Sequence, residues 1–550
     1  MGRILIVGGV AGGATAAARL RRLDEYAEII MFERGEYISF ANCGLPYHIG
    51  DAIPDREDLL LQTPESFNQR HNVDVRVQSE VLSIDRGAKT ITVQNKQSGE
   101  TYTEGYDKLI LSTGGAPIKP PIDGIDSDRV FTLRHIDDID RIKEYIAMNR
   151  PESAAVIGGG FIGIEMAENL KEAGLDVSIV ELSSQVIAPL DADMACDIHF
   201  HLRRRGVSLR LNNGLQKIAE KDGHLIVELS DGALEADMVI LAIGVRPDSL
   251  LAKDAGLELN GRGGIITDER MRTSDPDIYA VGDAVEVADL VTGQPAMIPL
   301  AGPANKQARI AADNICGIHS EYKGTQGSAV IKVFDMTVAS TGINEKTAER
   351  LGLNYDKIFL WQSGHASFYP GSEFMSVKVV FDKDNGKILG AQVVGYDGVD
   401  KRCDVLAVAI RAGMTAYDLA RLELCYAPPY SSVKDPVNIA GFVIENVLTG
   451  KVKHYHWHDL DALPRDGSVT LLDVRNPGEV AMGPVAGFAN IPLGTLRDRI
   501  GELDKSKPVY VLCHSGMRSY NAARILSQSG FDAYSLSGGF RLYEAVHRNA

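Results

Sequence analysis

The sequence predicts an α/β fold that contains two dinucleotide-binding units. Two segments carry this prediction: "RILIVGGVAGGATAAARLRRL" at 3–23 and "SAAVIGGGFIGIEMAENLKEAG" at 153–174. Each joins a short β-branched run to a glycine-rich turn and then to an alanine-rich helical pattern. Each is followed by a second apolar run that ends in an acid, Glu33 in the first unit and Glu181 in the second. The repeat therefore predicts two copies of the same strand–turn–helix–strand arrangement.

The glycines and the acid have separate roles in binding a dinucleotide. Glycines permit the tight turn and let backbone N–H groups approach a pyrophosphate, while the helix N-terminus adds partial positive charge. The acid accepts hydrogen bonds from ribose hydroxyls. The second unit has the complete glycine spacing at Gly158, Gly160 and Gly163, whereas the first has Val10 at the middle position. No arginine follows Glu181 in "ELSSQ", which favours NADH over NADPH.

Composition limits the remaining possibilities. The 550 residues correspond to about three or four domains, and 45% hydrophobic with 24% charged residues is ordinary globular composition. A net charge of −17 argues against a general nucleic-acid or membrane-surface binder. No apolar run reaches the roughly 18 residues of a membrane span. The six cysteines show no CxxC spacing, so no disulfide framework is expected.

The N-terminal stretch has an early arginine and an apolar run, so a signal peptide is an alternative interpretation. Four glycines between Gly8 and Gly13 argue against it, because a signal core prefers leucine. We therefore expect a cytoplasmic protein.

Three further segments read as strand–turn elements: "YDKLILSTGG" (106–115), "DMVILAIGVRPDS" (237–249) and "TSDPDIYAVGDAVEV" (273–287). In the last, Asp283 follows a strand end and can reach a sugar hydroxyl or a phosphate-bound water; a helix N-cap is the alternative role.

With these segments, residues 1–450 resemble the flavoprotein disulfide reductases that have two dinucleotide-binding domains. The resemblance implies that the first unit binds FAD and the second NAD(P)H, with the NAD domain inserted into the FAD domain. It also implies a C-terminal interface domain that forms a homodimer. The implied boundaries are 1–118 and 246–322 for the FAD-binding domain, 119–245 for the NAD(H)-binding domain, and 323–450 for the dimerisation domain.

The two loops and this resemblance together give the expected cofactor-binding residues. They are Gly8, Gly9, Val10, Ala11, Gly12, Gly13, Glu33, Arg34, Asn42, Gly158, Gly160, Phe161, Ile162, Gly163, Glu181, Gly244, Gly282 and Asp283.

The segment "SFANCGLPY" (39–47) contains one cysteine, Cys43, where most disulfide-reducing relatives carry a pair. It resembles the single-cysteine branch: coenzyme A disulfide reductases, NADH oxidases and NADH peroxidases. A single thiolate can attack a sulfur or peroxide substrate and form a mixed disulfide or a sulfenic acid. The flavin then restores the thiolate, and the substrate supplies the second sulfur. A small core residue is the alternative role for Cys43.

Several residues resemble the coenzyme A site of the coenzyme A disulfide reductases. Arginine and lysine suit its phosphates, although a solvated helix face is the alternative role for the arginines. The resemblance also implies that Tyr426, in "YAPPYSS", comes from the partner subunit and lies near the flavin and Cys43. Phe368 stands where the branch often has a tyrosine, and its effect stays open. The implied coenzyme A-binding residues are Thr15, Arg19, Arg22, Ser39, Asn42, Asn305 and Lys434.

Residues 452–550 read as a separate small α/β domain. They contain "VTLLDVRNPGEV" (469–480) and "VYVLCHSGMRSYNAARILSQSGF" (509–531), in which a strand delivers Cys513 to a loop that starts a helix. Loop N–H groups, the helix dipole and Arg518 would favour an anion or a persulfide. This part resembles a rhodanese domain. Phosphatase loops typically have five residues between cysteine and arginine, and this loop has four. An inactive rhodanese is the other alternative, and Cys513 argues against it.

The expected fold is therefore α/β, with two dinucleotide-binding (Rossmann-like) domains, an α+β dimerisation domain and a C-terminal α/β rhodanese domain. The expected function is an FAD-dependent, NADH-driven reductase of persulfides and polysulfides, and of coenzyme A disulfide or coenzyme A persulfide. The catalytic residues would be Cys43, Cys513, Tyr426 and Arg518, and no metal is expected. The alternatives are an NADH oxidase or peroxidase, a coenzyme A disulfide reductase with a passenger rhodanese, and a non-enzymatic sulfur relay. The sequence leaves open the sulfur donor, and whether sulfur passes within one subunit or between two.

Overall fold

The structure, a computed structural model, describes residues 2–548. It divides the chain into two compact units, one of residues up to 184 with 206–327, and one of 185–205 with 328 onward. The predicted domain boundaries stay a prediction, and their ends at residues 1 and 549–550 lie outside the described residues. Among the described residues, no helix has the length and apolar character needed to cross a membrane.

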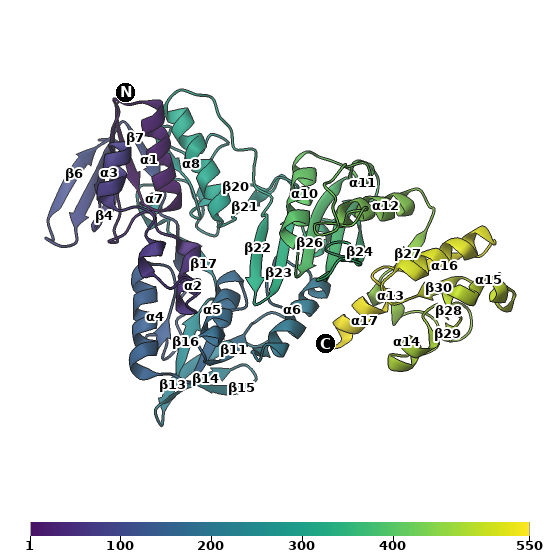
Figure 1. The fold of residues 1–550 in the computed structure, drawn as a ribbon. Coiled ribbons are helices and arrows are strands. Elements are labelled where there is room, and N and C mark those ends of the chain that lie inside the picture. The colour runs from purple at the N-terminus through teal and green to yellow at the C-terminus, as the bar shows by residue number, and fades with distance from the viewer. Residues whose placement is uncertain (1, 549–550) are drawn as a thin grey trace. The chain divides into compact units, whose positions relative to one another are not determined.

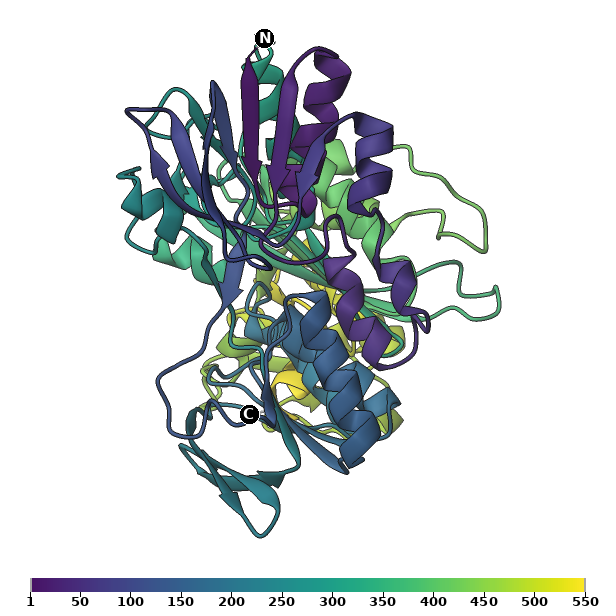
Figure 2. The ribbon, with the colours of Figure 1, turned by 90° about the vertical axis from the view of Figure 1, so that its left-hand side faces the viewer.

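The first unit contains a five-stranded parallel sheet. Most of its strands are nearly continuous apolar runs, as expected for parallel strands that are covered on both faces, and their side chains form the core of this unit. Helices α1 and α8 lie side by side along it (Figure 1), and Figure 2 shows the purple strands of the sheet beside each other. The strand order is β19-β7-β1-β2-β3. The elements are β1 (Arg3–Val7), α1 (Ala11–Leu23), β2 (Glu28–Phe32), β3 (Asp74–Arg76), β7 (Lys108–Leu111), β19 (Ile278–Ala280) and α8 (Ala301–Ile315).

A second parallel sheet in the same unit repeats this design with the order β12-β11-β10-β16-β9. Its glycine loop again connects the central strand to a helix. The elements are β9 (Val130–Phe131), α4 (Ile136–Asn149), β10 (Ser153–Ile157), α5 (Phe161–Glu172), β11 (Asp176–Val180), β12 (Ser208–Arg210) and β16 (Met238–Leu241). Each parallel sheet is accompanied by an antiparallel three-stranded sheet, formed by β4 (Ser79–Asp85), β5 (Thr90–Asn95) and β6 (Thr101–Gly105), and by β13 (Leu215–Lys221), β14 (His224–Leu229) and β15 (Gly232–Ala236).

Smaller elements of the first unit connect the two parallel sheets or complete their edges. Strands β8 and β17 pair antiparallel along the two connections between the sheets. These elements are η1 (Asn42–Gly44), α2 (Leu45–Ile49), η2 (Arg56–Leu59), α3 (Pro64–His71), β8 (Gly115–Pro117), β17 (Val245–Pro247), α7 (Leu250–Asp254), β18 (Ile265–Ile266), β20 (Val285–Ala288) and β21 (Pro295–Ala296).

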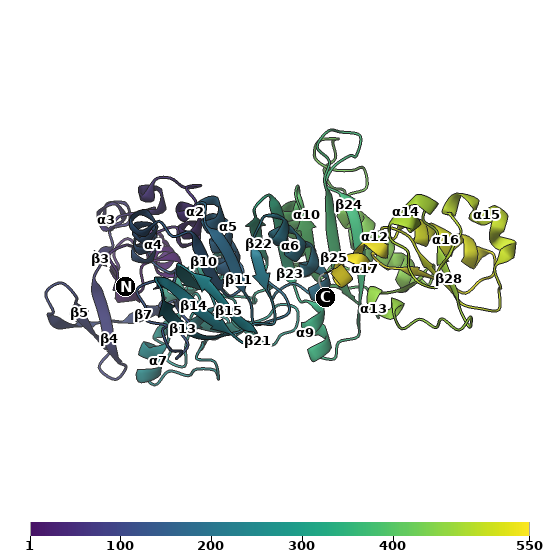
Figure 3. The ribbon, with the colours of Figure 1, turned by 90° about the horizontal axis from the view of Figure 1, so that it is seen from below.

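The second unit begins with an antiparallel sheet of order β22-β23-β26-β25-β24, against which α6 and α10 pack. Two long connections project from this part, one after β24 and one before α12 (Figures 2 and 3). The elements are α6 (Ala192–Arg204), β22 (Ala329–Val333), β23 (Met336–Gly342), α9 (Glu345–Arg350), β24 (Tyr355–Ser363), β25 (Phe374–Asp382), β26 (Ile388–Gly395), α10 (Val399–Arg411), α11 (Ala416–Leu419) and α12 (Pro436–Leu448).

The same unit ends in a parallel sheet of order β27-β31-β30-β28-β29 (Figure 1). Alternate residues of its strands belong to two apolar clusters, one on each face. The elements are β27 (Lys453–Tyr455), α13 (Trp457–Leu460), β28 (Thr470–Asp473), α14 (Pro477–Met482), β29 (Ala489–Asn490), η3 (Leu493–Thr495), α15 (Leu496–Arg499), η4 (Ile500–Glu502), β30 (Val509–Leu512), α16 (Met517–Gln528), β31 (Ala533–Leu536) and α17 (Gly539–Arg548).

Candidate active site

The first glycine loop lies between β1 and α1, and its glycines are required by close backbone contacts. Gly8 has φ +100°, and a Cβ there would lie 2.2 Å from the Ser112 carbonyl oxygen. A Cβ at Gly13 would lie 1.8 Å from the Gly8 oxygen. The carboxylate of Glu33, just after β2, accepts a hydrogen bond from the Gly9 N–H at 2.9 Å. The acid is thus held beside the loop, where a ribose bound at this loop would lie.

The second loop, between β10 and α5, has the same construction. A Cβ at Gly158, where φ is +109°, would lie 2.3 Å from the Ala242 oxygen, and one at Gly163 would lie 1.9 Å from the Gly158 oxygen. A Cβ at Gly160 would meet no atom within 4 Å, so this glycine faces open space. Glu181 accepts from the Gly159 N–H at 2.7 Å. Open space beside a glycine at a helix start fits the close approach of a dinucleotide phosphate.

The other predicted cofactor residues of this unit lie in these loops or in turns elsewhere in the unit. Arg34 forms an ion pair with Asp248 at 2.8 Å. Asp283 accepts from the Arg134 guanidinium at 3.2 Å, and no helix begins after it, so the N-cap alternative is wrong. Gly244 (φ +114°) and Gly282 (φ +88°) adopt left-handed turns after β16 and β19, while Val10, Ala11, Gly12, Phe161 and Ile162 form the starts of α1 and α5.

Cys43 lies in η1, directly before α2, and its side chain is exposed. Although the residue reaches solvent, partial burial raises the pKa of its thiol, and the negative charges of Glu165 and Asp283 raise it further. The Arg134 guanidinium acts in the opposite direction. These protein groups therefore favour the thiol over the thiolate, so the nucleophilic form needs an additional stabilising partner.

Glu165 was not identified from the sequence, yet its negative charge raises the pKa of Cys43 more than that of Asp283 does. It lies on α5 and accepts a hydrogen bond from the Tyr47 hydroxyl of α2 at 3.3 Å. Burial raises the pKa of Glu165 to about 7, with a further contribution from Glu168. An acid two residues after Gly163, within the otherwise apolar start of this helix, was the available sequence signal. The group changes charge near neutral pH and so can hold or release a proton there.

The predicted coenzyme A residues of the first unit fall into two places. The Thr15 hydroxyl of α1 donates to the Asn305 side chain of α8. Arg19, one turn further along α1, forms an ion pair with Asp313 of α8 at 2.7 Å, whereas Arg22 is exposed. Ser39 has φ +46° and Asn42 donates to the Arg134 carbonyl at 3.2 Å, and both lie in the Cys43 loop.

Two further predicted residues lie in the second unit, on the connection before α12: Tyr426, predicted near the flavin, and Lys434, predicted to bind coenzyme A. Tyr426 has 45% of its surface exposed, and Lys434 is exposed as well. Large apolar side chains are unusually exposed on both long connections of this unit, and they are Phe368, Tyr369, Tyr426, Tyr430 and Val433. We refer to the two connections that carry these residues as the exposed aromatic loops, because four of the five side chains are aromatic.

Cys513 is buried at the end of β30, at the first position of the loop before α16. The loop ends at Gly516, whose φ of +99° turns the chain into the helix. The Gly516 N–H donates to the Cys513 sulfur at 3.1 Å, and the thiol contacts the Ser519 hydroxyl at 3.4 Å. The backbone of the loop therefore already places one donor on the sulfur.

Arg518 pairs with a residue that sequence reasoning missed. Its guanidinium makes two hydrogen bonds, at 2.6 and 2.7 Å, with the carboxylate of Glu479 on α14. This arginine lowers the pKa of Glu479 to about 2. The positive charge of Arg518, which was predicted to act on the sulfur site, is therefore paired with the carboxylate of Glu479. Beside it, Arg475 and Asp473 form a fully buried ion pair at 2.7 Å that fixes the neighbouring turn.

Comparisons with known proteins cover most of the chain. A family model described as "Pyridine nucleotide-disulphide oxidoreductase" matches residues 2–308, and one described as its dimerisation domain matches 328–436. A model described as "Rhodanese-like domain" matches residues 456–545.

Individual proteins and solved structures are similar to this chain over most of its length. A coenzyme A disulfide reductase of Staphylococcus aureus is 38% identical over 443 residues, which cover 80% of this chain and 99% of that protein. The crystal structure of reduced Bacillus anthracis CoADR-RHD is 51% identical with a TM-score of 0.97, over 99% of this chain and 98% of that one. A structure of an NAD-dependent persulfide reductase from A. fulgidus is 37% identical with a TM-score of 0.91, over 98% and 99% of the two chains.

Proposed function

Since the chain belongs to the pyridine nucleotide-disulphide oxidoreductase family, with a rhodanese-like domain at its C-terminus, we propose that it is an NADH-driven reductase of sulfane sulfur. The acceptors would be persulfides and polysulfides, and also coenzyme A disulfide or coenzyme A persulfide. The family implies FAD and a pyridine nucleotide as cofactors. NADH as the preferred nucleotide and coenzyme A as a bound ligand are part of the proposal.

The observation that carries the proposal is the presence of two different thiol sites in one chain. Cys43 is exposed in a loop of the unit that holds both dinucleotide loops, whereas Cys513 is buried in a backbone loop of the rhodanese-like domain. A loop that donates a backbone N–H to sulfur suits a carrier of sulfane sulfur, because such a donor stabilises the negative charge of a persulfide. A single accessible thiol suits a reductase whose substrate supplies the second sulfur.

The chemistry balances with these two thiols. Cys513 accepts sulfane sulfur as a persulfide, and a thiol such as coenzyme A carries that sulfur away as its own persulfide. The Cys43 thiolate attacks the outer sulfur, which forms an S–S bond on Cys43 and releases the carrier thiol. Two electrons and a proton then break this bond, release sulfide and restore the thiolate; the flavin, when bound, passes these electrons from NADH.

The assignments of the remaining residues are supported by where they lie. The two glycine loops have the close backbone contacts and the adjacent acids that dinucleotides need. Thr15 and Asn305 meet on α1 and α8, and Ser39 and Asn42 share the loop of Cys43. Because Asp313 already neutralises Arg19, a coenzyme A phosphate would compete with that ion pair, and exposed Arg22 is the more accessible cation.

A homodimer is part of the same proposal. Residues 328–436 match a dimerisation domain, and the exposed aromatic loops project from that part of the chain. Exposed aromatic side chains on such loops are typical of a surface that a second subunit covers. Tyr426 would then reach the site of Cys43 on the partner subunit. A cytoplasmic location belongs to the proposal as well, supported by six cysteines that form no disulfide.

The test is steady-state NADH oxidation without oxygen by the purified flavoprotein, with a persulfide, coenzyme A disulfide and hydrogen peroxide as acceptors. The proposal expects persulfide to be reduced faster than peroxide, with one sulfide released for each NADH consumed. Fast turnover with peroxide alone would contradict it and would favour the peroxidase alternative. A tenfold excess of NADPH activity over NADH activity would overturn the nucleotide assignment while leaving the reductase intact.

A second candidate is a coenzyme A disulfide reductase in which the rhodanese-like domain takes no part. One observation favours it: the Staphylococcus aureus reductase aligns over 99% of its length with only 80% of this chain. Replacing Cys513 by serine separates the two candidates. In this variant, sulfide release from thiosulfate in the presence of coenzyme A and NADH should fall to background if the two domains cooperate. The same activity in the variant and the wild type would favour the second candidate.

A further inference from the structure

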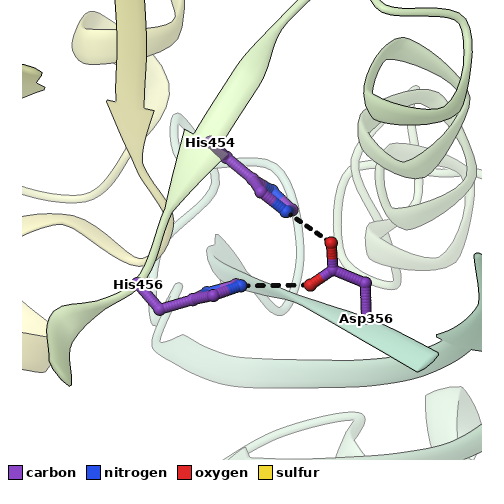
Figure 4. Close-up of side chains that lie close together, drawn as sticks. All are labelled: Asp356, His454 and His456. Atoms are coloured by element: carbon purple, nitrogen blue, oxygen red, sulfur yellow. Dashed lines mark hydrogen bonds and ion pairs between the residues drawn. The ribbon is translucent and has the colours of Figure 1, made fainter. Parts of the chain in front are cut away.

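A cluster of three side chains in the second unit has no role in the proposed reaction. Asp356 lies on β24, His454 on β27 and His456 directly after β27 (Figure 4). The Nε2 atoms of the two histidines lie 2.9 and 3.1 Å from separate oxygens of the Asp356 carboxylate. One potential ligand atom from each residue lies within 4.8 Å of the others. All three side chains are largely buried, with 11 to 20% of their surfaces exposed.

The local sequence explains why these side chains meet. His454 and His456 are two residues apart along an extended segment, so both rings lie on the same face. Tyr455 between them points the other way and is buried in the rhodanese-like core, where its hydroxyl donates to the Val511 carbonyl at 3.3 Å. On β24 the same alternation separates Asp356 from Lys357, whose ammonium pairs with Glu345. The three polar side chains therefore face one another between two strands that apolar packing holds in place.

We propose that Asp356, His454 and His456 form a binding site for zinc. Two imidazoles and one carboxylate are the donors that Zn²⁺ takes in sites with three protein ligands and one exchangeable position. An ion about 2 Å from each ligand atom fits this cluster after small side-chain rotations. The ion would join the strand that enters the rhodanese-like domain to the sheet of the dimerisation domain, both within the second unit. No metal was predicted from the sequence, and the H-x-H spacing in "HYHWH" is the sequence feature that corresponds to this cluster.

The charge around the cluster supports a cation there. Among the described residues, Asp356 forms ion pairs with the two histidines alone. The Lys357 backbone N–H also donates to its Oδ1 atom at 2.8 Å. The carboxylate is therefore surrounded by N–H donors, and no lysine or arginine side chain of the described residues pairs with it.

A second triad in the same unit serves as an internal contrast. Asp191, Asp193 and Glu345 also place three ligand atoms within 4.8 Å of one another. The ammonium of Lys378 occupies that site, 2.9 Å from Asp191 and from Asp193 and in contact with Glu345. A buried lysine is therefore already the cation of the acidic triad. At the histidine triad no lysine or arginine of the described residues takes this position.

The ring of His456 can present its Nε2 atom to a metal. Its Nδ1 atom is buried and has no hydrogen-bond partner among the described residues. No second hydrogen bond therefore fixes the proton of this ring on Nε2. When Zn²⁺ binds at Nε2, the ring adopts the tautomer with its proton on Nδ1, and the carboxylate turns one oxygen to the ion.

The experiment titrates metal-free holoenzyme, dialysed against a chelator, with Zn²⁺ in a calorimeter and, separately, with Co²⁺ in a spectrophotometer. The proposal expects one Zn²⁺ per chain that is lost, or weakened by at least about a hundredfold, in His456→Ala and Asp356→Asn. Co²⁺ should give visible d–d bands without the near-ultraviolet charge transfer of a thiolate ligand. The thermal midpoint of the wild type should rise with Zn²⁺, and that of the two variants should not.

The matched control is His458→Ala, which removes an exposed histidine from the same segment but not from the triad. It should bind Zn²⁺ like the wild type. Asp356→Asn preserves the shape of the side chain, and unchanged flavin content and circular dichroism would show that each variant is folded. Equal stoichiometry and affinity in the wild type and both triad variants, or a Co²⁺ spectrum dominated by thiolate charge transfer, would overturn the proposal.

Discussion

Cys43 and Cys513 both lie in loops that precede helices, but their surroundings differ in exposure and in charge. Cys513 is fully buried, and the Gly516 N–H already contacts its sulfur. Cys43 reaches solvent, yet partial burial raises the pKa of its thiol, and the charges of Glu165 and Asp283 raise it further. The chain alone therefore places a backbone N–H donor on the Cys513 sulfur, whereas at Cys43 its groups favour the neutral thiol.

This difference indicates how the two sites divide the work. The Cys513 loop depends on local backbone geometry, which persists in the absence of any ligand. The Cys43 site is assembled from η1, α5, the segment of Arg134 and the turn after β19, and its thiolate needs a further partner. A site of this kind suits a thiol whose reactivity a bound cofactor controls.

The largest expected effect is that of Cys43→Ser. Because a hydroxyl cannot form the S–S intermediate, NADH oxidation with persulfide or with coenzyme A disulfide should fall by at least about a thousandfold. Stopped-flow and steady-state absorbance of NADH under argon measure it. Cys425→Ser, which removes another exposed thiol, is the matched control and should keep full activity. Substantial persulfide turnover in Cys43→Ser would show that the two thiols do not divide the work in this way.

The second prediction concerns Cys513→Ser. Transfer of sulfur from thiosulfate to cyanide should fall by at least about a hundredfold, because the persulfide has no sulfur on which to form. Reduction of coenzyme A disulfide should stay within about twofold of the wild type. Thiocyanate formation and NADH absorbance measure the two activities on one preparation. A parallel loss of both activities would show that the sites are not separable.

The third prediction sharpens the electrostatic contrast through Glu165→Gln. Glu165, with a pKa of about 7, is charged above that pH and then raises the pKa of Cys43. Removing this charge should lower the pKa of Cys43 and speed its alkylation by iodoacetamide by about two- to fivefold at pH 8. Below pH 7 the carboxyl is protonated in the wild type, so the two proteins should converge. Labelling of Cys43 followed by peptide mass spectrometry measures this rate, and the exposed thiol of Cys425 serves as the internal reference.

The smallest expected effect is that of Glu479→Gln at the other site. Glu479 has its pKa lowered to about 2 by Arg518, so its ion pair stabilises the fold above the ordinary carboxyl pKa of about 4.3. That stability is lost as the pH falls from about 4 toward 2. The variant should unfold about 1 to 3 °C below the wild type at pH 7, with the difference shrinking below pH 4. Differential scanning calorimetry measures it, and Glu502→Gln, which breaks an exposed pair with Arg499, is the control.

Sequence reasoning was strongest where function depends on neighbours in the chain. The positions of Glu33 and Glu181 beside their glycine loops follow from the length of one strand–helix–strand unit, and the structure confirms both. The loop of Cys513 is likewise a continuous segment between a strand and a helix. In these cases the local pattern fixes the backbone, and the backbone places the chemistry.

Sequence reasoning failed where a side chain acts on a residue far away in the chain. Glu165 lies more than 100 residues from Cys43, and Glu479 lies 39 residues from Arg518. Nothing in either segment indicates which distant charge it meets. The wrong N-cap alternative for Asp283 has the same origin, because its partner Arg134 comes from a strand connection 149 residues earlier.

The sequence by itself determined the two glycine loops, the single thiol at Cys43 and the loop of Cys513 between a strand and a helix, since each is a continuous pattern whose backbone geometry is local. Only the tertiary structure decided which charges and how much burial surround the Cys43 thiol. It also decided that Lys378 fills one triad while Asp356, His454 and His456 form another. Charges act through space, and the fold alone sets the distances and the burial on which their energies depend.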